Sequence, residues 1–321
     1  MQHYKNYVRN LFILFGIIIG SAVAYAYYFS IHYPIPVTNR ISFDAKIKFI
    51  REHIDVDKVD TLIVGSSIGL NNVQGAYLEK ESKRAESVLN LSVYESSAFQ
   101  VEQLLMLSDA FPNLKRIIYS AQFSDFPYPS RFKDYNPELL KRYIRDELNP
   151  FEHFMLMFRA CRNLYFCYNR QREWASEHAM NNKFTYLGFD HTGSVPLHIY
   201  GKDIIRKRWS IPHGSAQNPK AFDAVARMTK RATDKGIEFY FVQQPYRQHL
   251  VDANKHIQLL MQTFPTRIKK IMQANGGEFL NLHDTLHLSD AYFADRSHLN
   301  DKGSIVGAEA IGRFIDASEK R

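Results

Sequence analysis

Apolar and polar positions follow each other along most of this chain in a pattern that predicts alternating strands and helices. Short apolar runs have the length of buried strands, and between them apolar residues recur at helical spacing. The predicted strands cover 59–64, 87–91, 114–119, 237–242 and 278–282. The predicted helices cover 67–82, 98–111, 218–235, 264–274 and 301–317. This order predicts an α/β protein with a flavodoxin-like, three-layer α/β/α architecture around a parallel five-stranded sheet.

The first apolar segment differs from the others because it is long and uncharged. Residues 11–29 are almost entirely apolar, and no formal charge occurs between Arg9 and Arg40. A membrane span needs about 20 apolar residues, so we expect a transmembrane anchor over 10–31. A cleaved signal peptide is the alternative, since 24–26 reads Ala-Tyr-Ala, but the run exceeds the roughly 7–15 residues of a signal core. A buried core helix does not fit a segment that is apolar on every face.

The residues beside this span predict its orientation. Lys5 and Arg9 precede it, so we expect 1–9 to form a cytoplasmic tail and the rest of the chain to lie outside the cytoplasm. Three tyrosines near the far end suit the membrane interface; they are Tyr25, Tyr27 and Tyr28. Basic residues at 46, 48 and 51 weaken the charge argument. The expected protein is single-pass in the inner (cytoplasmic) membrane, with its N-terminus inside.

The remaining chain divides into a linker, a domain and an insertion. Residues 32–58 contain Pro34 and Pro36 and are expected to be a linker before a domain over 59–321. Residues 126–215 separate the third and fourth strands by far more than a usual crossover. We interpret them as a helical insertion, with an aromatic helix near 151–168 and a turn-rich patch at 188–196, packed over the carboxyl edge of the sheet.

Composition and net charge limit the classes of molecule that the protein is expected to bind. The 321 residues are 45% hydrophobic and 23% charged, with a formal net charge of +8, and 126–215 hold 14 Lys and Arg against 9 Asp and Glu. An extracytoplasmic protein rarely meets nucleic acid, so this surplus points to anionic lipid head groups or an acidic glycan, or equally to an ordinary solvated surface.

The chain has two cysteines, Cys161 and Cys167. They are six positions apart in one predicted helix, on different faces and too distant to bridge without distortion. We therefore expect two small buried apolar residues and no disulfide.

Candidate chemistry lies at the two ends of the predicted domain. Ser67 follows the first strand directly after Gly65 and Ser66, where a helix begins. Near the other end, Asp295 stands three residues before His298 at the head of the last helix. One loop can then bring an imidazole to the serine hydroxyl while the carboxylate orients the ring, as acyl-transfer chemistry requires. Either element alone is weak, because Ser66 and Ser67 could simply cap a helix.

Together the two elements resemble the SGNH/GDSL hydrolase family. Gly65-Ser66-Ser67 is similar to the family's first block, with serine in place of the usual aspartate, and Asp295-x-x-His298-Leu299-Asn300 is similar to its last block. Such Gly-Ser-Ser variants occur in membrane-anchored members, including D-alanine transfer and polysaccharide O-acetylation proteins. The resemblance covers about 59–126 and 218–317.

The resemblance also implies oxyanion donors, and here the chain departs from the family. The family's glycine after the second strand is replaced by Ser92, and its asparagine after the third strand by Gln122. The expected donors are thus the N–H groups of Ser67 and Ser92 with the Gln122 amide. A missing donor costs about 3–4 kcal/mol in the transition state, so these departures put strict hydrolase activity in doubt. We expect no cofactor and no metal, since His283, Asp284 and His287 match no metal-binding motif.

The expected protein is therefore a membrane-anchored extracytoplasmic serine esterase or O-acyltransferase. Ser67 is the expected nucleophile, His298 the base and Asp295 the orienting carboxylate. The expected partners are the membrane, an acylated glycan or lipid-linked substrate, and an envelope modification complex. Two alternatives remain: an inactive SGNH-type scaffold in an envelope polysaccharide assembly or modification complex, and a glycan-binding module.

Overall fold

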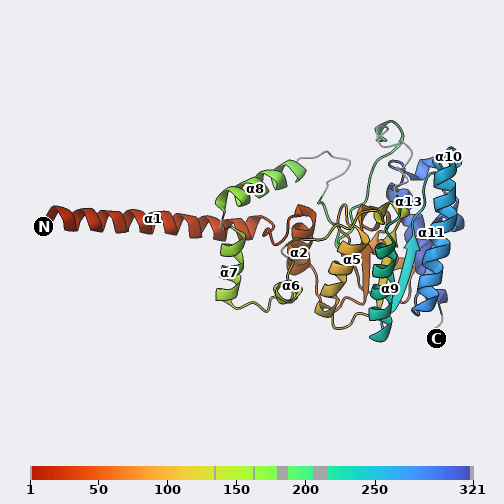
Figure 1. The fold of residues 1–321 in the computed structure, drawn as a ribbon, viewed down its shortest axis with the longest axis horizontal. Helices are drawn as coiled ribbons and strands as arrows, with labels where there is room; N and C mark the ends of the chain where they lie inside the picture. The colour runs from red at the N-terminus through yellow and green to blue at the C-terminus, as the bar shows by residue number, and fades with distance from the viewer. Residues whose placement is uncertain (1, 134, 162, 179–186, 205–215, 319–321) are drawn as a thin grey trace.

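The computed structural model describes residues 2–133, 135–161, 163–178, 187–204 and 216–318 (Figure 1). It contains a five-stranded parallel sheet in the order β2-β1-β3-β4-β5. The strands are β1 Thr61–Gly65, β2 Val88–Asn90, β3 Arg116–Ala121, β4 Glu238–Gln243 and β5 Glu278–Asn281. This is the flavodoxin-like strand order. The predicted α/β class is confirmed, and each predicted strand agrees with the structure to within two residues at either end.

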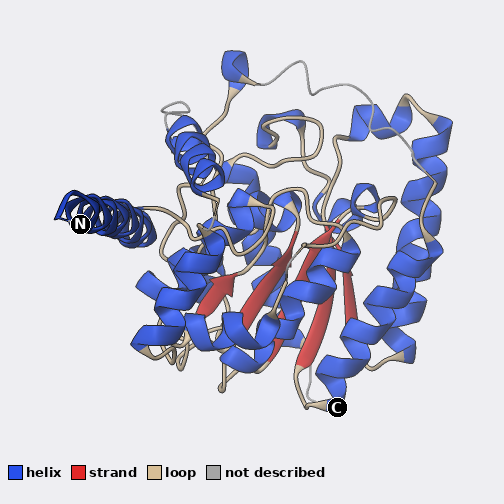
Figure 2. Cartoon of the chain, turned by 60° about the vertical axis from the view of Figure 1, so that its left-hand side comes forward, coloured by secondary structure: helices blue, strands red, loops and turns tan. Residues whose placement is uncertain are grey.

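Helices cover both faces of the sheet because strand residues alternate in direction. Leu62 and Phe241 point into the larger core, and Ile63 and Val242 point into the smaller one. The helices of the first face are α5 Ala98–Leu104, α9 Pro219–Asp234 and α11 Lys255–Ala274. Those of the second face are α4 Gly75–Glu81 and α13 Asp301–Ala317. The short helix α3 Ser67–Asn72 lies between β1 and α4 in the chain. Figure 2 shows the strands between these two helical layers, with their carboxyl ends along one edge.

The structure has further helices and 3₁₀ turns. The helices are α2 Ile41–His53, α6 Pro137–Ile144, α7 Pro150–Ala160, α8 Leu164–His178, α10 Gln248–Asp252 and α12 Leu282–Leu286. The 3₁₀ turns are η1 Leu105–Ala110, η2 Phe123–Asp125, η3 Gly201–Asp203 and η5 Asp290–Tyr292.

The N-terminal helix α1, Gln2–His32, projects from the domain (Figure 1). It is long and apolar enough to cross a membrane, and only 6% of its most apolar window is buried. A core helix would be covered by its own protein, so this exposure fits a membrane anchor or a signal sequence. In both whole-chain views the strands of the sheet run across the direction of α1 (Figures 1 and 2).

The segment expected to be a linker, 32–58, contains helix α2, Ile41–His53. Phe43, Ile47 and Ile50 of this helix are buried in the larger core. Lys46 is also buried, and its ammonium donates to the Asn90 carbonyl at 2.8 Å. Pro34 and Pro36 lie at the start of this segment, and the helix that follows them is part of the folded domain.

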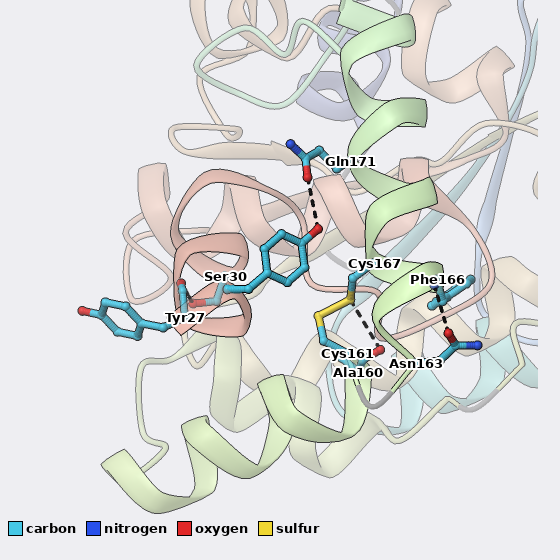
Figure 3. Close-up of a disulfide and its surroundings, with 9 residues drawn as sticks. Tyr27, Ser30, Ala160, Cys161, Asn163, Phe166, Cys167 and Gln171 are labelled. Carbon is cyan, nitrogen blue, oxygen red and sulfur yellow. Dashed lines mark hydrogen bonds between the residues drawn. A yellow bond between two sulfur atoms is a disulfide. The ribbon is translucent and has the colours of Figure 1, made fainter. Parts of the chain in front are cut away.

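The expectation of unbridged cysteines is wrong. Cys161 and Cys167 form a disulfide, with Cα atoms 5.5 Å apart (Figure 3). The predicted single helix is two helices, because α7 ends at Ala160 and α8 begins at Leu164. The cysteines therefore face each other across a corner rather than along one helix. We call this pair of helices, 150–178 with its described residues, the α7–α8 hairpin.

The later part of the insertion follows the carboxyl edge of the sheet. The N–H of Asn90 donates to the Thr192 carbonyl at 2.7 Å, and the N–H of Val195 donates to the Leu70 carbonyl at 3.0 Å. Further along, the Asp301 N–H donates to the Leu197 carbonyl at 2.9 Å. This stretch thus joins the end of β2 to the start of α13. The basic run of the insertion, Arg206-Lys207-Arg208, lies outside the described residues.

Candidate active site

Ser67 lies at the junction of β1 and α3. β1 is fully buried and ends at Gly65, where a Cβ would lie 2.3 Å from the Ser120 carbonyl oxygen of the neighbouring strand. Ser66 caps α3, and its hydroxyl accepts the Ile68 N–H at 3.2 Å. Ser67 is the first helical residue and is partly exposed. The chain order reverses between β1 and β3, and open α/β sheets bind ligands at such a point.

The structure brings Ser67 and His298 together. The Nε2 atom of His298 lies 2.8 Å from Ser67 Oγ, although the residues are 231 positions apart in the chain. The His298 side chain is 18% exposed, so substrate could reach the pair. This distance is that of a strong hydrogen bond between a nucleophile and its base.

Asp295 lies behind the imidazole. Its Oδ2 is 2.8 Å from His298 Nδ1, and its Oδ1 accepts the N–H groups of Ser297 at 2.9 Å and His298 at 2.8 Å. Burial alone would raise the pKa of Asp295, but the facing imidazole and these N–H groups outweigh it and hold the pKa well below its usual range. A carboxylate that stays ionised accepts the Nδ1 proton and leaves Nε2 free to accept the Ser67 proton.

Two amide side chains hold the loop that carries Asp295 and His298. Asn72, the last residue of α3, accepts the Leu299 N–H at 2.9 Å and donates to the Ser297 carbonyl at 3.0 Å. Gln122 donates to the Pro245 carbonyl at 2.8 Å and to the same Ser297 carbonyl at 3.4 Å. The serine-bearing helix and the histidine-bearing loop are therefore joined directly. Sequence reasoning missed Asn72, whose signal was a polar pair, Asn71 and Asn72, in an otherwise apolar helix.

The three expected oxyanion donors differ in their surroundings. The Ser67 N–H is the first of α3, so it has no partner four residues back in that helix. The Ser92 N–H donates to Asn90 Oδ1 at 3.0 Å, and Ser92 is fully buried beside Gly69. The Gln122 amide nitrogen donates to the two carbonyls given above. Ser92 and Gln122 thus use their donors within the fold, and Ser67 is the expected donor that remains.

A second carboxylate, missed from the sequence, lies at the site. Asp125 ends the turn after β3, and its Oδ2 accepts the Gln122 N–H at 2.9 Å. Burial raises the pKa of Asp125 to about 6, against the opposing effects of the Gln122 N–H, the Ser66 hydroxyl and the nearby His298. This carboxyl group titrates in the range where an acyl-transfer base works.

Among the described residues, no three His, Cys, Asp or Glu side chains gather as they would to hold a metal ion. The Tyr246 N–H donates to His283 Nδ1 at 3.4 Å, and burial lowers the pKa of His283.

Comparison with known proteins adds little to this geometry. No protein-family model matches the chain, and no curated protein matches it in sequence. Among the solved structures that match is a "putative acylhydrolase" from Bacteroides fragilis NCTC 9343, with a TM-score of 0.43 and 11% identity over 84% of this chain and 94% of the other. A match this distant does not bear on activity or substrate.

Proposed function

We propose that this protein is a serine esterase or O-acyltransferase of the SGNH type, anchored in the membrane with its site outside the cytoplasm. One observation carries the proposal: two contacts of 2.8 Å link Ser67 to His298 and His298 to Asp295. A hydroxyl, an imidazole and a buried ionised carboxylate in this order make up the nucleophile, base and orienting group of acyl transfer.

The proposed reaction has two half-steps. Ser67 Oγ attacks an acyl carbonyl and its proton passes to His298 Nε2, while the Ser67 N–H stabilises the oxyanion. The ester bond breaks, the leaving alcohol takes the proton from His298, and an acyl-Ser67 remains. Water or a sugar hydroxyl then gives its proton to His298 and attacks the acyl carbonyl. The bond between Ser67 Oγ and the acyl carbon breaks, Oγ takes the proton back from His298, and free acid or a new ester is released.

The proposed substrate is an acylated cell-envelope glycan or a lipid-linked one. Two features support a site outside the cytoplasm. Helix α1 has the length and composition of an anchor. The Cys161–Cys167 disulfide and the site both follow α1 in the chain, so they would lie on the same side of the membrane. Disulfides persist in oxidising compartments.

Fluorophosphonate labelling of the detergent-solubilised full chain tests the nucleophile. We expect wild type to be labelled, Ser67→Ala to be unlabelled and His298→Ala to react at least 100-fold more slowly. Ser176→Ala removes an exposed serine of α8 and serves as the matched control. An unlabelled wild type, or labelling that survives Ser67→Ala, would overturn the proposal.

A second candidate is a non-catalytic scaffold with the same fold, in an envelope assembly complex. One observation favours it. The N–H of Ser92 and the side-chain amide of Gln122, two of the expected oxyanion donors, donate to groups of the fold instead: Asn90, Pro245 and Ser297. Hydrolysis of p-nitrophenyl acetate that disappears in His298→Ala would exclude it.

A further inference from the structure

The α7–α8 hairpin packs directly against the end of α1. Cys161 and Cys167 share an apolar cluster with Ala26 and Phe29. The Tyr25 hydroxyl also donates to Gln171 Oε1 at 3.1 Å (Figure 3). Figure 1 shows α7 and α8 on either side of the point where α1 meets the domain. The hairpin is therefore fixed to the last turns of α1.

These last turns are where a membrane span would leave the hydrocarbon. At 1.5 Å per residue, 11–29 covers about 28 Å, close to the ~30 Å thickness of a bilayer core. With this segment across the membrane, Phe29 lies at one boundary, and Phe29 is one of the residues that the hairpin touches. The hairpin consequently lies at the depth of the lipid head groups.

The outer surface of the hairpin has the composition of that interface. Outside α1, nine large apolar side chains are exposed among the described residues, and six of them belong to the hairpin. They are Phe151, Phe158, Leu164, Tyr165, Phe166 and Tyr168, between 41% and 70% exposed. Exposed arginines accompany them: Arg159 lies next to Phe158, and the Arg172 guanidinium lies 5.9 Å from the centre of the Tyr168 ring.

Packing holds the α7–α8 hairpin rigidly against the domain. Arg170 of α8 is buried and pairs with Asp44 of α2 at 3.0 Å, and it also pairs with Glu173 at 2.9 Å. Together with the disulfide, this pair fixes α8 to both the domain and α7. Aromatic rings with cations at their border, on a rigid helix pair, suit the boundary between acyl chains and anionic head groups.

We propose that the α7–α8 hairpin is a second membrane contact of this chain, with its aromatic surface seated in the head-group region of the bilayer that α1 crosses. This inference rests on the proposed anchor. Continuity selects a lipid surface as the occupant, because the hairpin packs on Ala26 and Phe29 at the end of the exposed apolar helix α1 that the bilayer would surround.

Tryptophan quenching by brominated lipids, measured on the full chain in proteoliposomes, tests whether the hairpin contacts lipid. The vesicles contain phosphatidylethanolamine and phosphatidylglycerol, and the background carries Trp174→Phe and Trp209→Phe, which removes both native tryptophans. Single indoles are introduced by Tyr165→Trp in the hairpin, by Ile17→Trp in α1, and by Leu259→Trp on α11, a matched exposed position away from the hairpin.

We expect brominated lipid to quench the indoles at 17 and 165 at least twofold and the indole at 259 by less than a tenth. If the indole at 17 is quenched and the indole at 165 behaves like that at 259, the hairpin does not touch lipid and the anchor still stands. If the indole at 17 is not quenched, the anchor fails and this inference fails with it.

Discussion

Asn72 accepts the Leu299 N–H at 2.9 Å and so ties the end of the serine-bearing helix to the loop that holds the histidine. The same side chain donates to the Ser297 carbonyl at 3.0 Å. Asn72 is fully buried, and both bonds therefore form away from water. Ser67 and His298, which make the 2.8 Å contact, are carried by the two segments that this link joins.

Asn72→Ala should lower both stability and turnover. Leaving buried backbone groups without partners costs about 1–3 kcal/mol, and a displaced His298 should reduce fluorophosphonate labelling by about 10–100-fold. The Tm and the labelling rate measure the two effects. Asn113→Ala removes an exposed amide that donates to the Asp57 carbonyl at 2.7 Å, far from the loop at 297–299 in the sequence, and it should change neither. An Asn72→Ala chain that is labelled at the wild-type rate would show that the link does not position His298.

Asp125→Asn should stabilise the protein in a pH-dependent way. The pKa of Asp125 is raised to about 6, above the value of about 4 in an unfolded chain. The stability from its protonated form is thus present below about pH 4 and lost as pH rises through 6. The gain from Asp125→Asn should be below about 1 kcal/mol at pH 4.5 and up to about 3 kcal/mol at pH 7.5.

Melting temperatures at the two pH values, measured in the same detergent, check this difference. Asp223→Asn neutralises an exposed carboxylate of α9 and should show no such growth with pH. If Asp125→Asn changes the Tm equally at both pH values, the pKa of Asp125 is not raised in the folded chain.

Gly65→Ala should prevent the site from forming. A Cβ at Gly65 would lie 2.3 Å from the Ser120 carbonyl oxygen, so two central strands would have to separate. We expect a loss of more than about 3 kcal/mol, seen as aggregation or a large fall in Tm. Gly312→Ala in α13 is the control, because its Cβ would make ordinary 3.4 Å contacts with Glu81 and Ser82 at the end of α4 and should be tolerated. A Gly65→Ala chain with wild-type Tm and labelling would count against the close approach of β1 and β3.

Replacing both cysteines by serine should loosen the hairpin and leave the site intact. A disulfide that closes so short a loop contributes about 2 kcal/mol. Faster hydrogen exchange is expected in α7 and α8, with unchanged exchange in β1 and unchanged labelling of Ser67. Dithiothreitol should have the same effect on wild type and none on the double variant. Faster exchange throughout the sheet would mean that the hairpin is part of the main folding unit.

The sheet could be predicted, and three candidate site residues could be picked out, because each rests on a local pattern. Buried parallel strands are short apolar runs, Ser67 follows the end of such a strand, and Asp295 and His298 precede the start of the last helix. Their 2.8 Å contacts, however, come from packing between distant segments.

What sequence reasoning missed depends on tertiary contacts. The predicted helix 67–82 breaks after Asn72, and this residue then turns to the loop at 297–299. The corner between α7 and α8 shows no proline or glycine, so 151–168 resembled one helix and the cysteines seemed unable to meet. Asp125 was missed because only the folded chain brings it close to Ser66 and His298.

The strands run across the direction of α1, so the carboxyl edge of the sheet, which carries Ser67, lies to one side of the axis of that helix (Figures 1 and 2). With α1 in a bilayer, this edge would keep a constant height above the lipid. An acyl donor of the proposed lipid-linked kind, carried by the same membrane, would then meet Ser67 by two-dimensional lateral diffusion, without a search through bulk solution. The rate of encounter would follow the surface density of the donor, and dilution of the cells would leave it unchanged.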